Sequence, residues 1–251
     1  MTRGSSTLTK GLELLRLMGN YPDGATAAVF ARDSGLPFST AYRLLNTLAD
    51  TGFAQYEPQT KQYRLGLTVF ELSQVTAAAR GYDGTILPVL RELSEATNES
   101  CLFAVPDGTE SVTVHTVDGP EFRQTTDPGD RLPLHVSSMG KAMLAAMPDQ
   151  MAEEMISQLD LQAYTEYTVT DPQVLEQQVA AGRHDGYVYQ NQEVDLGMNA
   201  LAAPVTTPAG RLLGAVAIAA PIFRADKTQL LTYRDALQQA VQHLAATLPA
   251  K

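Results

Sequence analysis

The side chains between residues 39 and 47 have the chemistry of a nucleic-acid contact. Ala41, Leu44, Leu45 and Leu48 recur at three- and four-residue steps, which predicts a helix over residues 39–50 with these four side chains turned inward. The outer face then carries Ser39, Thr40, Tyr42, Arg43, Asn46 and Thr47. Hydroxyl groups suit phosphate oxygens, a guanidinium suits guanine or phosphate, and a carboxamide suits adenine. Any solvated helix can show such residues, so the helix alone leaves a DNA-reading helix and an ordinary surface helix equally open.

The elements before this helix predict a helix-turn-helix. Apolar residues at helical spacing predict a helix over residues 7–18, and a short helix follows over residues 27–34. Thr26 is a suitable N-cap for the short helix and a candidate DNA contact, and Gly35 stands where that helix should end. In two helices joined by a tight glycine turn, the second enters the major groove.

A hairpin is predicted directly after these helices. Residues 53–56 and 62–65 have the composition of two short strands around a polar turn. A hairpin in this place is a wing, whose Lys61 near the tip could reach a phosphate or the minor groove, with Arg64 close behind. The order of three helices and a hairpin favours DNA binding over an ordinary surface helix.

The overall charge neither supports nor excludes this interpretation. The chain has a net charge of −10, yet residues 1–66 contain seven basic and five acidic side chains, a net charge of +2. A mildly basic segment permits DNA binding without indicating it, so the local placement of charge must carry the affinity.

The remaining residues predict a linker and an α+β domain built around an antiparallel sheet. Residues 67–80 favour a helix that Gly81 and Gly84 interrupt, either a linker between domains or an ordinary surface helix. Strands are expected over residues 100–105, 111–117, 122–125, 183–188, 200–206 and 211–219. Helices are expected over residues 86–97, 137–147, 172–182 and 226–248.

Signatures of catalysis and of metal binding are absent from the sequence. Cys101 lacks an evident histidine and acid partner, and Ser138 lacks the GxSxG context of a nucleophile. The four histidines have no metal-ligand spacing: His115, His135, His184 and His243. We therefore expect no enzyme, no cofactor and no bound metal.

One loop that leads into a helix could hold a small anion. Residues 129–145 place small side chains before a helix whose first amides have no partner within the helix. Those amides and the positive end of the helix dipole suit a carboxylate or another polar ligand. The alternative is a helix capped by Ser137 or Ser138, with no ligand.

Both halves of the sequence resemble the IclR family of bacterial transcriptional regulators. The N-terminal half carries GLPxSTxYRLLxTL over residues 35–48 and a closing YRLG over residues 63–66, and the C-terminal half carries GDRLPLHVSSMGKAMLA over residues 129–145. The resemblance implies a winged helix whose Ser39, Thr40, Tyr42, Arg43 and Asn46 face the operator, a linker helix that pairs two subunits, and a GAF-like effector domain. Phe38 departs from the pattern, since a polar or basic residue is more usual there, and it could pack on a thymine methyl.

The resemblance also implies an effector pocket. Its lining would include the helix start Ser138, Met139 and Gly140 together with Gln190, Ala200, Ala217 and Ala219. Several relatives that bind small carboxylates carry polar or acidic groups at the last four positions, so this pocket is expected to be more apolar. Such a pocket suits an aromatic or moderately hydrophobic acid. The alternative is that these alanines only pack the sheet and the pocket is small or empty.

These inferences give a domain plan and a set of partners. The expected domains are a winged helix over residues 1–66, a linker and hinge over residues 67–84, and an effector-binding and oligomerisation domain over residues 85–251. The expected partners are operator DNA, a small-molecule effector and a second copy of the chain, as a dimer or a dimer of dimers. A cytoplasmic location is expected, because no apolar run is long enough for a membrane span. The competing class is a stand-alone metabolite-binding or enzymatic domain whose N-terminal segment only dimerises.

Overall fold

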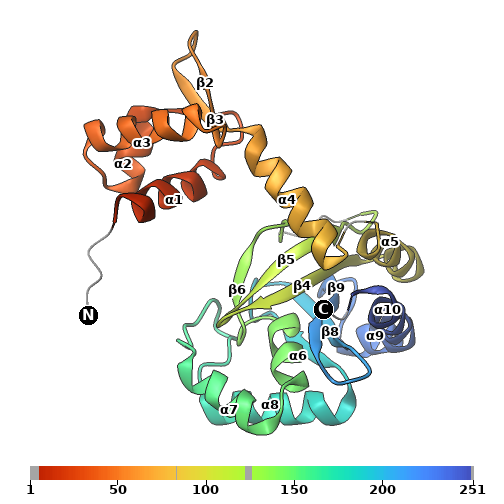
Figure 1. The fold of residues 1–251 in the computed structure, drawn as a ribbon. Coiled ribbons are helices and arrows are strands. Elements are labelled where there is room, and N and C mark those ends of the chain that lie inside the picture. Colours follow the sequence, from red (N-terminus) through yellow and green to blue (C-terminus); the bar gives the residue numbers. More distant parts are fainter. Residues whose placement is uncertain (1–5, 83, 122–125, 250–251) are drawn as a thin grey trace. The chain divides into compact units, whose positions relative to one another are not determined.

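The chain divides into two compact units, Met1–Ala79 and Arg80–Lys251, each with a hydrophobic core of its own. The computed structural model describes residues 6–82, 84–121 and 126–249 (Figure 1). Helices and antiparallel strands occur in both units, so the chain is an α+β protein, as the sequence predicts.

Three helices form the core of the N-terminal unit: α1 (Thr7–Met18), α2 (Ala27–Ser34) and α3 (Phe38–Asp50). Leu14, Phe30 and Leu45, one from each helix, are completely buried against one another. The expected inner side of α3 is confirmed, since Ala41, Leu44 and Leu45 are buried. The 3.6-residue period of these apolar positions is what places the polar residues between them on the opposite face.

A tight turn at Gly35 separates α2 from α3. Gly35 has a left-handed backbone with φ of 67°, which glycine adopts without a steric penalty. The Leu36 amide then donates to the Ala31 carbonyl at 3.1 Å, the bond that closes a Schellman-type helix end. Thr26 occupies the N-cap position of α2 as expected, but its side chain makes no capping hydrogen bond.

The predicted wing is present, with one additional strand. β2 (Ala54–Glu57) and β3 (Gln62–Leu65) pair antiparallel, and β1 (Ala25–Thr26) lies along the other side of β3. The sequence did not reveal β1, because a two-residue strand has no period to detect. A helix, α4 (Leu67–Arg80), follows over the predicted residues, and none of its residues is buried.

A six-stranded antiparallel sheet of order β6-β5-β4-β9-β8-β7 is the centre of the C-terminal unit. Its strands are β4 (Ser100–Asp107), β5 (Glu110–Val117), β6 (Arg131–Pro133), β7 (Val188–Asn191), β8 (Met198–Thr206) and β9 (Leu212–Pro221). Along β9 the side chains of Ala217 and Ala219 face one layer of helices, while Val216 and Ile218 face the other. Because both faces are covered, the strand sequence is apolar throughout and does not alternate with polar residues.

Helices cover both faces of this sheet (Figure 1). One layer consists of α5 (Ile86–Thr97), α9 (Lys227–Thr232) and α10 (Arg234–Thr247), and the other of α6 (Ser138–Ala146), α7 (Asp149–Gln158) and α8 (Pro172–Asp185). α6 packs directly on β8 and β9 and is covered in turn by α8. As a result every residue from Ser138 to Ala145 is buried.

The expected strand over residues 183–188 is wrong. α8 continues to Asp185, ends at Gly186 with φ of 77°, and is followed by β7 from Val188. Tertiary contacts explain the longer helix, since the Arg183 side chain donates to the carbonyls of Ala145 and Met147. These bonds hold the last turn of α8 against the end of α6.

The single helix expected over residues 226–248 is also wrong. It is divided at Tyr233 into α9 and α10, where the Tyr233 amide donates to the Leu230 carbonyl at 3.0 Å in a turn tighter than an α-helix. The sequence missed α7, β6 and β7, which are short or lack a clear period. The strand expected over residues 122–125 lies outside the described residues.

Candidate functional site

The first candidate site is the outer face of α3. Ser39, Tyr42, Arg43 and Thr47 are exposed on it, and Thr40 is partly buried. The Thr47 hydroxyl donates to the Arg43 carbonyl one turn earlier at 3.0 Å, so its proton is already used within the helix. The face therefore offers a guanidinium, a phenol and the Ser39 hydroxyl to a ligand.

Asn46 joins the helix to the wing. Its Oδ1 accepts a hydrogen bond of 2.7 Å from the hydroxyl of Tyr63, whose ring is 1% exposed in β3. This bond fixes the direction of the carboxamide and leaves its NH₂ group as the donor. Asn46 therefore has a structural role in the N-terminal unit that the sequence did not indicate.

Two exposed aromatic rings lie at the start of α3. Phe38 and Tyr42, one helical turn apart, stack with ring centroids 5.9 Å apart and an interplanar angle of 17°. They remain 57% and 47% exposed. A stacked pair of this kind is a flat apolar surface that could contact a thymine methyl.

The wing places two basic side chains on the same unit. Lys61 lies at the turn with φ of 56° and is exposed. Arg64 is exposed on β3, and its Nε donates to the Gln55 side chain at 3.2 Å, which steadies the guanidinium on the wing. Thr26 is half-buried beside them, in the strand β1 that pairs with Gln62.

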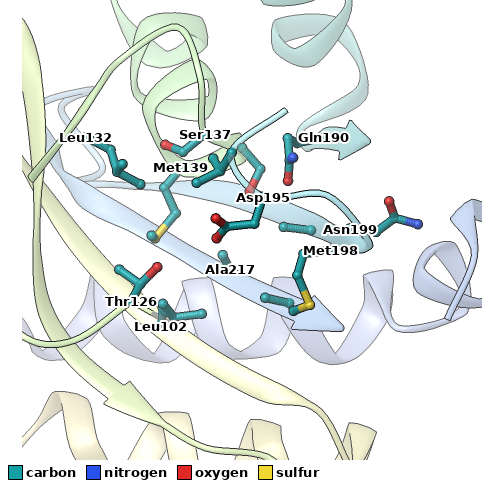
Figure 2. A pocket seen from close by; sticks show the side chains of 14 residues that line it. Leu102, Thr126, Leu132, Ser137, Met139, Gln190, Asp195, Met198, Asn199 and Ala217 are labelled. Atoms are coloured by element: carbon teal, nitrogen blue, oxygen red, sulfur yellow. The ribbon is translucent and has the colours of Figure 1, made fainter. Parts of the chain in front are cut away.

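The second candidate site is a cavity of about 40 Å³ between the start of α6 and the sheet. Six of the seven residues expected to contact an effector line it: Ser138, Met139, Gln190, Ala200, Ala217 and Ala219. They come from α6, β7, β8 and β9, so the fold brings together positions up to 81 residues apart. Figure 2 shows the Asp195 carboxylate pointing into this space, between the side chains of Met139 and Met198.

The start of α6 offers polar backbone groups to this cavity. The Ser137 hydroxyl caps the helix by accepting from the Gly140 amide at 3.0 Å. Within the part of the chain that the structure describes, the amides of Ser138 and Met139 have no hydrogen-bond acceptor. Two helix-terminal amides beside an apolar wall can bind a carboxylate.

Gly140 does not line the cavity. A Cβ at Gly140 would lie 2.4 Å from the carbonyl oxygen of Leu134, so the helix approaches that segment more closely than any side chain permits. The glycine is therefore needed for packing.

Gln190 supports a loop beside the cavity. With its carboxamide oriented by the surrounding donors, Oε1 accepts from the amides of Gln192 and Val194 at 3.1 and 3.2 Å, and also from that of Glu193. These bonds shape the connection between β7 and β8. The next residues of that connection, Val194 and Asp195, form part of the cavity wall.

Several lining residues were missed by the sequence reasoning. Val194 and Asp195 belong to the β7–β8 connection, Met198 begins β8, and Thr126 and Leu132 precede α6. A connecting loop has no period that reveals which side chains point inward, so these residues were not picked out as contacts.

Cys101, the nucleophile that the sequence raised, is buried in the C-terminal unit. Burial raises the pKa of the Cys101 thiol to about 12, which keeps it protonated and unreactive. Among the residues that the structure describes, no three histidine, cysteine or acidic side chains are grouped to hold a metal ion. No described helix is long and apolar enough to cross a membrane.

Together, a winged helix and an α+β domain with a cavity beside its central sheet indicate a DNA-binding regulator with an effector-binding domain. Two family models match the chain, the IclR helix-turn-helix domain over residues 7–58 and the bacterial transcriptional regulator IclR C-terminal domain over residues 84–246. The chain belongs to the IclR family. This is a family of transcriptional regulators and not of enzymes.

Similar proteins agree with this assignment. The chain is 29% identical to the regulator BhcR of Paracoccus denitrificans, over 96% of this chain and 87% of that protein. It is 29% identical to the transcriptional repressor IclR of Escherichia coli, over 87% and 81% of the two chains. An IclR homologue from Microbacterium hydrocarbonoxydans, solved in complex with 4-hydroxybenzoate, superposes with a TM-score of 0.80 at 25% identity, covering 96% of this chain and all of that one.

His135 is a titratable side chain in the core of the C-terminal unit. Its ring is completely buried beside α6, Nε2 lies 3.0 Å from the Gln162 carbonyl, and Nδ1 has no partner among the described residues. Burial, with a smaller contribution from the nearby Lys141 charge, lowers the pKa of His135 below 6.5. As the pH falls through 6.5 the unfolded chain takes up a proton that the folded chain does not, so stability is lost from there down to the folded pKa.

We expect His135→Asn to flatten this slope. The variant cannot titrate, so the melting temperature of the C-terminal unit should fall less between pH 7 and pH 5 than that of the wild type. Thermal unfolding across this range measures it, and His184→Asn, at a ring 89% exposed, is the matched control. Equal slopes in wild type and His135→Asn would contradict the assignment.

Proposed function

We propose that this regulator recognises a two-fold operator through α3 and the wing, and that an aromatic or moderately hydrophobic acid in the α6 cavity controls its DNA binding. The observation that carries the effector class is the cavity itself. Its walls are formed largely by Leu102, Met139, Ala200, Ala217 and Ala219, and its polar groups include the Asp195 carboxylate and the Ser138 and Met139 amides, which have no acceptor among the described residues. Apolar walls with few polar groups favour a ring or a longer chain over a two- or three-carbon oxo acid.

The volume of the cavity sets a condition on this proposal. About 40 Å³ holds only a few water molecules, so an aromatic acid must displace side chains to enter. Met139 and Met198 lie on either side of the space in Figure 2 and can change rotamer at low cost. The Microbacterium relative whose structure contains 4-hydroxybenzoate supports testing that compound first.

Arg43 and Lys61 have different roles in DNA binding. Arg43 on the exposed face of α3 reads a base, and Lys61 at the wing turn contacts the backbone. The Phe38–Tyr42 stack packs against the same groove. A second copy of the chain binds the second half-site of the operator.

The exposed apolar surface of α4 favours a dimer. Leu67, Phe70, Leu72 and Val75 of α4 are between 52% and 77% exposed in the single chain. Four large apolar side chains on a helix with no buried residue are a surface that another protein normally covers. We propose that another copy of α4 covers it, in the cytoplasm where the operator is found.

The DNA-binding role predicts distinct effects for two substitutions. Arg43→Ala should weaken binding to the promoter upstream of its own gene by about 1–3 kcal/mol and reduce discrimination between sequences, because a base contact is lost. Lys61→Ala should weaken binding to all sequences alike. It should also reduce the slope of log K against log salt concentration by about one, because one phosphate contact is lost. Gel-shift titrations at several salt concentrations measure both, with Arg91→Ala on the exposed side of α5 as the control. Unchanged binding in both variants would exclude the assigned roles.

The effector class predicts a selective thermal shift. At a hundredfold excess over its dissociation constant, 4-hydroxybenzoate should stabilise the protein by about 2.7 kcal/mol, while glyoxylate and pyruvate should not. Ala200→Leu fills the cavity and should abolish the shift, whereas Ala180→Leu on the exposed side of α8 should keep it. Stabilisation by the short acids alone would overturn the proposed effector class.

The dimer predicts a change in mass. Phe70→Glu should convert the wild-type dimer into a species of one chain, 27.1 kDa, because it places a charge in an apolar interface. Light scattering measures the mass, and Gln74→Glu, at an exposed polar position of the same helix, is the control. A wild-type protein that is already monomeric when bound to DNA would refute the pairing through α4.

A further inference from the structure

A buried ion pair connects α6 with the loop between β7 and β8. Lys141 Nζ and Glu193 Oε2 are 2.6 Å apart, and their side chains are 0% and 5% exposed. Lys141 also donates to Gln178 of α8 at 2.6 Å, and Glu193 Oε2 accepts from the Val169 amide at 3.2 Å. Burial lowers the pKa of Lys141 and the Glu193 carboxylate opposes this effect.

Stability alone is a poor reason for such a pair. Removing two charges from water costs nearly as much as their attraction returns, and apolar residues of similar size often stabilise a core equally well. What an ion pair with several hydrogen bonds provides is a fixed geometry between the elements that it joins.

The backbone of Glu193 is held by hydrogen bonds in addition to the ion pair of its side chain. Its carbonyl accepts from the Thr168 hydroxyl at 2.7 Å, and its amide donates to the Gln190 side chain. The preceding residue, Gln192, has φ of 55° and its carbonyl accepts from the Thr165 hydroxyl at 2.7 Å. Residues 192 and 193 are therefore anchored by several groups, and the rest of the connection is tied by the Val194 amide on Gln190 and by the Gly197 amide on the Gln192 side chain at 2.9 Å.

The residues that follow this fixed point form a wall between two cavities. Val194 and Asp195 line the 40 Å³ cavity and also an outer cleft of about 280 Å³. Thr126 and Leu132 are shared by both spaces as well. The position of Val194 and Asp195 therefore sets the width of the inner cavity and the opening between the two.

Lys141 belongs to α6, whose start forms part of the cavity wall. It is the fourth residue of the helix, two residues after Met139, and Ser138 and Met139 are the α6 residues that line the cavity. The ion pair thus ties the loop to α6 beside the cavity and not across it, since neither Lys141 nor Glu193 is among the lining residues and Lys141 also bonds Gln178 of α8.

We infer that Lys141 and Glu193 are a positioning pair that sets the width of the effector cavity by holding the 192–197 loop at a fixed distance from α6. The pair acts through Val194 and Asp195 and does not touch the effector. This inference rests on the proposed function for the ligand, but the positioning of the loop can be measured without one.

The test is a double-mutant cycle in the full-length protein. Lys141→Met and Glu193→Gln each leave one buried charge uncompensated, so both should lower the melting temperature. The double variant K141M/E193Q contains no buried charge at this place and should recover most of the lost stability. Its loop should nevertheless be untethered, so that the amides of residues 194–196 exchange hydrogen at least about tenfold faster than in the wild type.

Two further variants complete the design. Glu193→Asp retains both charges and shortens the connection by one methylene, so it should fold, and loop exchange should again be faster. Asp149→Asn breaks the Arg183–Asp149 ion pair between α8 and α7, and should lower stability while exchange at residues 194–196 is unchanged. If exchange in K141M/E193Q returns to the wild-type rate together with the melting temperature, the pair is only structural and the inference is wrong.

The effect of the ion pair on ligand binding is measured separately, as the affinity for 4-hydroxybenzoate. The double variant should bind it about tenfold more weakly than the wild type, although its stability has recovered. Wild-type affinity in the double variant would overturn the inference. If the wild type does not bind 4-hydroxybenzoate, the proposed effector class fails, and the exchange rates in the ligand-free protein still decide whether the pair positions the loop.

Discussion

The complete burial of α6 is the constraint on which the C-terminal unit depends. The helix lies between the sheet and α8, so every side chain from Ser138 to Ala145 is removed from water. Its composition follows from this position. Gly140 permits contact with the Leu134 backbone, alanines face the strands, and the single cation, Lys141, requires a buried carboxylate. The same position directs the first amides of the helix at the cavity.

The sequence predicted the elements correctly wherever nearby residues decide the local structure. The apolar period of α3 and the glycine at position 35 predicted the helix-turn-helix, and the wing strands were placed to within a residue. The positions expected around an effector came from the family resemblance. Six of them line one cavity in the structure, although their role in binding a ligand stays a prediction.

The sequence was insufficient wherever partners distant in the chain decide. The last turn of α8 is helical because Arg183 bonds carbonyls 36 and 38 residues away, which no local pattern shows. Gln190 and Asn46 were expected to contact ligands, yet both carboxamide oxygens bind other parts of the protein. The Lys141–Glu193 pair joins residues 52 positions apart, so its existence was not detectable from spacing.

An effector can change DNA binding only by its differential affinity for two states of the protein. A rigid cavity of 40 Å³ is too small for an aromatic acid, so the proposed effector class requires two states that differ in the walls of the cavity. One wall is the buried helix α6. The other is the loop between β7 and β8, which is held at Glu193 and whose next residues, Val194 and Asp195, also line the outer cleft. Residues 194–198 are partly buried or exposed while Ser138–Ala145 of α6 are buried, so the proposed effector requires the loop, and not α6, to change position. A ligand that fits one position of Val194 and Asp195 better than another shifts that equilibrium, and the sign of the regulatory response is set by which of the two states binds the operator more tightly.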